Sequence, residues 1–203
     1  MLHRADSQGL IVIGQPAHAW VSGQIARAWG NEHFGRFAPW EEVCLAAEQH
    51  DLGMAAWDAT PDLNEATGMP YSYREMPRPV HVALWSSAAS LVLPQSRYAA
   101  LLVSLHGTAL YQEDLSHDDP AVRDYLEREH AFQQQLIDSL RADLYYAPYA
   151  APEMVARNRR LVARFDGISL ALCHALDFEH AHTGVPTADA ETTITVTPVA
   201  RTR

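Results

Sequence analysis

The sequence predicts a mainly α-helical single domain spanning residues 1–203, with a small β-sheet built from its N- and C-terminal segments. Three observations favour this class. Apolar residues recur at helical spacing through most of the chain from about residue 15 to about residue 178. Short runs with strand character lie near the two ends, at about 10–14 and 192–198. A length of 203 residues suits one domain with a sizeable core.

The first half of the chain predicts one strand, two helices and a long loop. Leu10-Ile11-Val12-Ile13 is an apolar run typical of a strand. Pro16 suits the first turn of a helix, because its missing N–H is one of the donors left unpaired there. Pro39 begins a second helix, which ends near Gly53. Residues 53–79 carry several prolines and no helical periodicity, so we expect an ordered loop over a pocket.

The second half predicts four helices and a strand. The helices are expected at about 79–93, 95–111, 120–146 and 152–178. The tail from residue 181 to residue 203 is rich in threonine and alternates as a strand does over residues 193–197. We expect this strand to pair with the N-terminal strand in one small sheet. The apolar strands and the tail are also compatible with a homodimer.

Composition excludes several function classes. The formal net charge of −10 argues against nucleic acid or an anionic membrane as the main partner. The 15 basic residues are all arginine, which excludes Schiff-base chemistry on lysine and the Gly-Lys-Ser/Thr phosphate loop. The N-terminal residues 1–9 are polar, and no run approaches the roughly 18 apolar residues of a membrane span. We therefore expect a cytoplasmic protein.

Histidines and aspartates in apolar helical surroundings are the strongest functional signal. An unpaired imidazole is costly in such a setting, and helices that converge on a bundle core can hold a metal between facing side chains. Neutral imidazoles with carboxylates suit first-row transition metals such as iron, manganese or zinc. The candidate metal ligands are His18, His50, Asp51, His81, His106 and Asp166.

The order of these residues resembles the HD superfamily of metal-dependent phosphohydrolases. His50-Asp51-Leu52-Gly53 is similar to its His-Asp-hydrophobic-Gly signature, with His18 before it and Asp166 in a late helix. His81 and His106 fall where dinuclear members carry additional ligands, in the HD-GYP phosphodiesterases and in the di-iron oxygenases on the same fold. The resemblance covers about residues 10–178.

The chain as a whole also resembles a bacterial family of unknown function, through residues 15–18, 50–53 and 98–106. It departs from the phosphodiesterase pattern at two points. Met54 stands where that signature usually has lysine, and His106 is followed by Gly107 instead of a second histidine. These departures argue against a cyclic-di-nucleotide phosphodiesterase.

The resemblance implies an HD-like helical bundle with one or two divalent ions of iron, manganese or zinc. Asp51 would be the catalytic residue and would bridge two metals through its two oxygens. The remaining ligands would divide into two sets, with His18, His50 and Asp166 on one metal and His81 and His106 on the other.

Hydrolysis of a small phosphoester is the first functional hypothesis. The alternatives are a di-iron oxygenase acting on a small anionic substrate and a non-catalytic module for binding or sensing. An anionic substrate favours arginine, whose planar fork suits bidentate contacts to phosphate. We expect Arg74, Arg78 and Tyr71, in the loop after the His-Asp helix, to contact that substrate.

Overall fold

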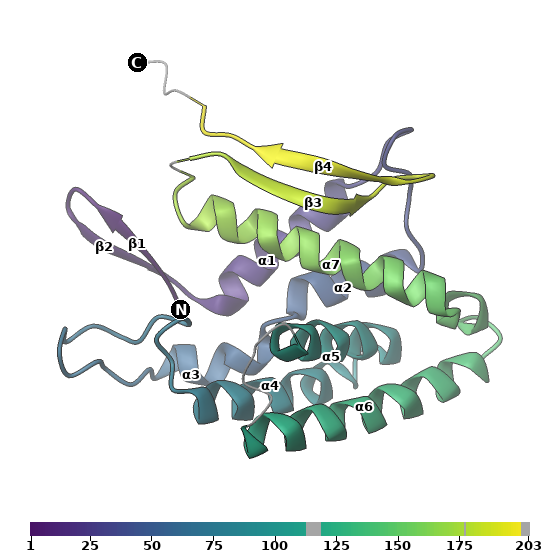
Figure 1. The fold of residues 1–203 in the computed structure, drawn as a ribbon, viewed down its shortest axis with the longest axis horizontal. Coiled ribbons are helices and arrows are strands. Elements are labelled where there is room, and N and C mark those ends of the chain that lie inside the picture. Colours follow the sequence, from purple (N-terminus) through teal and green to yellow (C-terminus); the bar gives the residue numbers. More distant parts are fainter. Residues whose placement is uncertain (113–118, 177, 200–203) are drawn as a thin grey trace.

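The computed structural model describes residues 1–112, 119–176 and 178–199. It confirms a mainly helical fold with short strands near the two termini (Figure 1). The helices are α1 (Gln15–Ala28), α2 (Trp40–Gln49), α3 (Ala55–Ala59), α4 (Arg78–Val92), α5 (Arg97–Gln112), α6 (Pro120–Arg141) and α7 (Pro152–Cys173), with short 3₁₀ turns η1 (Leu52–Met54) and η2 (Ala147–Ala150). The strands are β1 (Leu2–Asp6), β2 (Gly9–Ile13), β3 (His180–Pro186) and β4 (Glu191–Val196).

Proline in the first turn marks the start of α1, α4, α6 and α7, as the sequence predicts. Several helices end earlier than expected. Helix α2 ends at Gln49, not near Gly53, and α6 ends at Arg141, not near residue 146. Helix α1, which the sequence predicts to run to about residue 33, stops at Ala28, because Trp29 is extended and Gly30 has a positive φ of 114°. Helix α7 stops at Cys173, since Ala175 takes the left-handed conformation common just after a helix, and residue 177 lies outside the described residues.

The strands form two separate antiparallel hairpins, β1–β2 and β3–β4. The prediction that residues 10–14 pair with residues 192–198 in one sheet was wrong. The polar turn after Asp6 folds β1 back onto β2, so that Leu2 pairs with Ile13. A hairpin closes only a short loop and loses less chain entropy than pairing between the two ends of the chain.

Helix α5 lies at the centre of the core. Its residues 98–103 are fully buried, and α2, α4, α6 and α7 pack around it. Figure 1 shows α7 and α6 on opposite sides of α5, with the β3–β4 hairpin along the outer side of α7. Among helices in the described part of the chain, none has both the length and the hydropathy that a bilayer crossing requires.

Two glycines allow the close helix contacts that bring the His-Asp turn to its neighbours. A Cβ on Gly23 of α1 would lie 2.7 Å from the Cβ of Glu48 on α2. A Cβ on Gly53 in η1 would lie 2.4 Å from the carbonyl oxygen of Leu84 on α4, where no atom fits. The glycine of the His50-Asp51-Leu52-Gly53 motif is therefore a packing requirement of the turn against α4.

Candidate metal centre

All six predicted ligands line one cavity of about 80 Å³, and five of them belong to clusters of donor atoms there. His18 comes from α1, His50 and Asp51 from the end of α2, His106 from α5 and Asp166 from α7. His18 and His50 are each 1% exposed, so their imidazoles are removed from solvent except through this cavity. The side chains form two donor groups that share His50: one with His18 and Asp51, the other with His106 and Asp166.

The donor atoms of four residues surround one point. Asp51 Oδ2 lies 2.8 Å from His18 Nε2 and 3.5 Å from His50 Nε2. Asp166 Oδ1 lies 3.6 Å from His18 Nε2 and 3.4 Å from His50 Nε2. Ligands about 2.1 Å from one ion are separated by roughly 3.0–3.4 Å in octahedral or tetrahedral geometry. These spacings fit a single divalent transition metal.

The tautomer of His50 supports this assignment. Its Nδ1 lies 2.9 Å from the carbonyl oxygen of Ala47, which can only accept, so Nδ1 carries the proton. Its Nε2 is buried and makes no hydrogen bond within the described residues. In the neutral ring, the lone pair of that nitrogen faces the carboxylate oxygens of Asp51 and Asp166, an arrangement that a cation between them stabilises. Without a metal, a proton on Nε2 takes that place, because the two carboxylates raise the pKa of His50.

His18 has the same tautomer for a different reason. Ser169 Oγ donates its single proton to the backbone carbonyl of His18 at 2.7 Å. His18 Nδ1 lies 3.1 Å from the same Ser169 oxygen and must therefore be the donor of that contact. The Nε2 lone pair of His18 is directed at Asp51. A hydrogen bond on the remote nitrogen is the usual way in which proteins orient a histidine toward a metal.

Asp166 joins the two donor groups. Its Oδ1 faces His18 and His50, whereas its Oδ2 lies 3.5 Å from His106 Nε2. The contacts of Asp51 with His18 and His50 use Oδ2 alone. The carboxylate that spans both groups is thus Asp166, whereas the sequence interpretation gave that position to Asp51.

The charges of the site shift its pKa values strongly. Burial lowers the pKa of His50, yet the carboxylates of Asp51 and Asp166 outweigh burial and raise it to about 9. Burial raises the pKa of Asp166, but the adjacent His50, followed by the charges of His106 and His18, lowers it to about 2. Burial lowers the pKa of His106 to about 4, so this imidazole is neutral and can donate a lone pair. Two buried carboxylates at one point require positive charge.

Residues 1–202 match the model of a family described as "Protein of unknown function (DUF3891)". The chain belongs to the DUF3891 family. No match was found among curated proteins or among solved structures. The description of the DUF3891 family states no activity, so the function of this member has to be argued from its site.

His81 of the DUF3891 chain lines the same cavity but belongs to neither donor group found among the described residues. Its Nε2 accepts a hydrogen bond from Trp85 Nε1 at 3.3 Å, which leaves the proton on Nδ1. That proton points to the hydroxyl of Tyr111, whose oxygen is 2.5 Å away. Both ring nitrogens are therefore engaged by protein groups, and the structure does not bring His81 to the other five residues as a ligand.

Two of the three predicted substrate residues lie beside this cavity. Arg74 and Arg78 are exposed and line an adjoining hollow of about 220 Å³ together with Tyr73. Tyr73, not Tyr71, also lines the metal cavity itself, and Arg74 Nε donates to the Tyr73 hydroxyl at 2.9 Å. Tyr71 lies in the preceding segment, where its backbone N–H donates to the carbonyl of Asp62, and borders neither hollow.

Sequence reasoning missed two groups of residues on α7. Ser169, which orients His18, follows Asp166 by three positions and so shares its helix face. Arg159, Arg160 and Arg164 line a second hollow next to His106 and Asp166. The signal available in the sequence was the helical spacing of these residues from Asp166. That spacing indicates a role at the site only when Asp166 is known to face a cavity.

Proposed function

We propose that this protein is a metal-dependent phosphohydrolase of the HD type that acts on a small phosphoester. One observation supports the proposal above others: the Nε2 atoms of His18 and His50 each lie 2.8–3.6 Å from one carboxylate oxygen of Asp51 and one of Asp166. This donor set of neutral imidazoles and carboxylates suits iron, manganese or zinc. The match in residue order to the HD signature agrees with it.

The number of ions follows from the donor groups. The first group, His18, His50 and Asp51, gains a fourth donor atom from Asp166 Oδ1 and is the better candidate for a tightly held ion. The second, with His106 and Asp166 Oδ2, shares His50 with the first and lacks His81. We infer one tightly bound ion, with a weaker second position at His106.

A divalent ion held by these residues supplies Lewis acidity toward a phosphoryl oxygen and activates water at neutral pH. The chain itself contributes orientation and exclusion of bulk water. Met54, Leu110 and Leu170 give the cavity an apolar wall around its polar floor. In a site of low polarity, the attraction between the centre and an anionic group is much stronger than in water. Arg74 and Arg78 stand at the adjoining hollow to receive such a group.

The test is phosphate release from a panel of small phosphomonoesters and phosphodiesters by protein loaded with Mn²⁺. We expect hydrolysis of at least one ester, and a loss of at least about a hundredfold in Asp51→Asn and Asp166→Asn. Asp124→Asn, an exposed aspartate on α6, is the matched control and should keep full activity.

Other results would contradict the proposal in recognisable ways. Oxygen consumption after anaerobic loading with iron, without release of phosphate, would point to an oxygenase. A purified protein that binds no divalent ion would point to a module for binding or sensing.

A further inference from the structure

We propose that Arg159, Arg160 and Arg164 on α7 form a subsite that binds a phosphate group of the substrate. The inference rests on the proposed function, because it places this phosphate beside the candidate metal centre. The three arginines line a hollow of about 300 Å³ whose walls include His106, Leu110 and Asp166, all of which also border the metal cavity. The two spaces therefore meet at the residues of the second donor group.

The geometry of α7 accounts for the hollow. Arg159, Ala163 and Asp166 stand at positions i, i+4 and i+7, so they share one face of the helix. At 1.5 Å per residue, Arg159 begins about 10 Å along the axis from Asp166. The small side chain of Ala163 stands between them along the helix, and Ala109 of α5 also lines the hollow. Two alanines where helices face each other leave room for a ligand instead of a packed contact.

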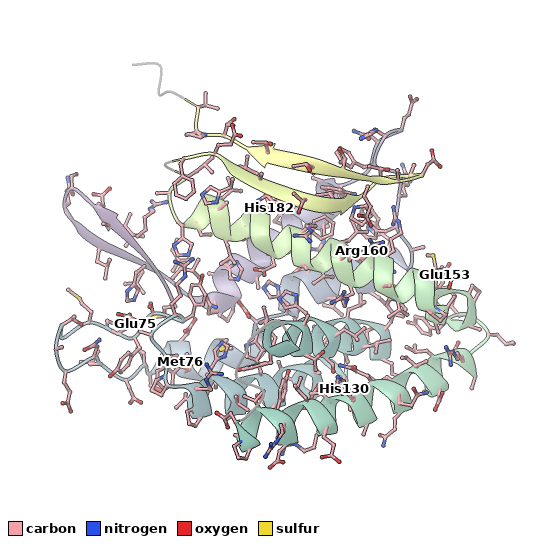
Figure 2. The ribbon with its side chains drawn as sticks, in the orientation of Figure 1. Glu75, Met76, His130, Glu153, Arg160 and His182 are labelled. Carbon is pink, nitrogen blue, oxygen red and sulfur yellow. The ribbon has the colours of Figure 1, made fainter. Side chains whose placement is uncertain are left out.

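Among the three arginines, only Arg160 has an acidic partner in the described part of the chain. Arg160 forms an ion pair with Glu191 of β4 through Nη1. Arg159 and Arg164 form no hydrogen bond or ion pair with residues in the described ranges. Figure 2 labels Arg160 on α7, next to the β3–β4 hairpin to which Glu191 belongs.

Two of the guanidinium donors are also unsatisfied. The Nε atoms of Arg160 and Arg164 are buried and lack a hydrogen-bond partner among the described residues. A buried donor without a partner costs about 1–3 kcal/mol, more when it is charged, so such groups indicate a missing acceptor. A phosphate offers several acceptor oxygens and matches the planar fork of arginine.

The net negative charge of the protein should direct anions to this hollow in preference to the rest of its surface. The chain carries a net charge of −10, which repels anions from most of its surface. Three arginines gather positive charge around one concave space, next to the position where a divalent ion would add more. This cluster is separate from Arg74 and Arg78, which line the hollow on the Tyr73 side of the metal cavity.

The experiment measures binding of inorganic phosphate by isothermal titration calorimetry, once with Mn²⁺ and once with a chelator. We compare the unaltered protein with the double variant R159A/R164A and with R123A, which removes an exposed arginine on α6. Binding of Mn²⁺ is measured separately by equilibrium dialysis. We expect the double variant to bind phosphate at least about tenfold more weakly in both conditions, with Mn²⁺ affinity within about twofold. R123A should match the unaltered protein.

A second double variant, R159K/R164K, keeps both positive charges but loses the planar guanidinium groups that bind phosphate through two N–H donors. We expect intermediate phosphate affinity, which a general loss of folding would not produce. Equal phosphate affinity in R159A/R164A and the unaltered protein would overturn the inference, as would absence of phosphate binding by the unaltered protein. Arginine-dependent phosphate binding without any Mn²⁺ binding would instead refute the proposed function and leave the subsite standing.

Discussion

Ser169 Oγ donates a hydrogen bond to the backbone carbonyl of His18 at 2.7 Å and accepts one from His18 Nδ1 at 3.1 Å, across 151 residues of sequence. This double contact fixes both the position and the tautomer of His18. The serine hydroxyl thereby directs the His18 Nε2 lone pair to the point where Asp51 and Asp166 converge.

Ser169→Ala should weaken divalent metal binding by about tenfold without loss of the fold. The variant removes the acceptor of His18 Nδ1, and loss of such an orienting group typically lowers metal affinity 10–100-fold. The dissociation constant for Mn²⁺ or Zn²⁺ is measured by competition with a chromogenic chelator. Ser90→Ala, an exposed serine on α4, is the matched control. Equal affinity in both variants would mean that Ser169 has no part in orienting His18.

Added divalent metal should stabilise the protein against heat. An ion that binds the folded state alone stabilises it by about 2.7 kcal/mol at a free concentration of 100 times its Kd. For a domain of 203 residues, that corresponds to a rise in Tm of roughly 5–11 °C. Asp166→Asn should lose most of this rise, and Asp124→Asn should keep it. A rise of the same size in Asp166→Asn would place the ion elsewhere.

Gly53→Ala should destabilise the fold by about 1–3 kcal/mol, the usual cost of overpacking. The new Cβ would lie 2.4 Å from the Leu84 carbonyl oxygen and 3.0 Å from the Ala88 Cβ, so the His-Asp turn must move away from α4. Urea denaturation gives the free energy of unfolding, and metal affinity should fall with it. Ala56→Ser, an exposed change of one atom on α3, should leave both unchanged. An unaffected Gly53→Ala protein would show that this contact is not required.

Glu129→Gln should become progressively more stable than the unaltered protein as pH rises above 4.5. Burial raises the pKa of Glu129, against a smaller lowering by the hydrogen bond from Ser104. Because its pKa is raised on folding, Glu129 contributes to the stability of the unaltered protein at pH values below its unfolded pKa, where it is protonated in both states. This contribution is lost as pH rises through the folded pKa, and glutamine, which does not titrate, loses nothing. A folded pKa that is higher than the unfolded pKa by one corresponds to a loss of about 1.4 kcal/mol.

The measurement is the difference in unfolding free energy between variant and unaltered protein at several pH values from 4.5 to 8. Glu127→Gln, an exposed change on the same helix, should give a difference that does not change with pH. A pH-independent difference for Glu129→Gln would mean that Glu129 titrates in the folded protein as it does in the unfolded chain.

The sequence predicted the helices well because their signals are local. Pro16 and Pro152 mark helix starts through a missing N–H and a fixed φ, and neither property depends on distant residues. Strand pairing was predicted wrongly because the apolar pattern of residues 10–13 shows that they form a strand without showing which strand is the partner.

The sequence by itself determined the helical class and named six candidate donors, five of which the fold brings into the two donor groups, because donor chemistry and apolar helical context are both properties of individual positions. The tertiary structure alone decided that His81 bonds to Tyr111 and Trp85, that Ser169 orients His18, and that arginines of α7 border the site. Apart from the contact between His81 and Trp85, which are one helical turn apart, these relations join residues far apart in the chain. A proton's position on an imidazole depends on which group the fold places against its other nitrogen.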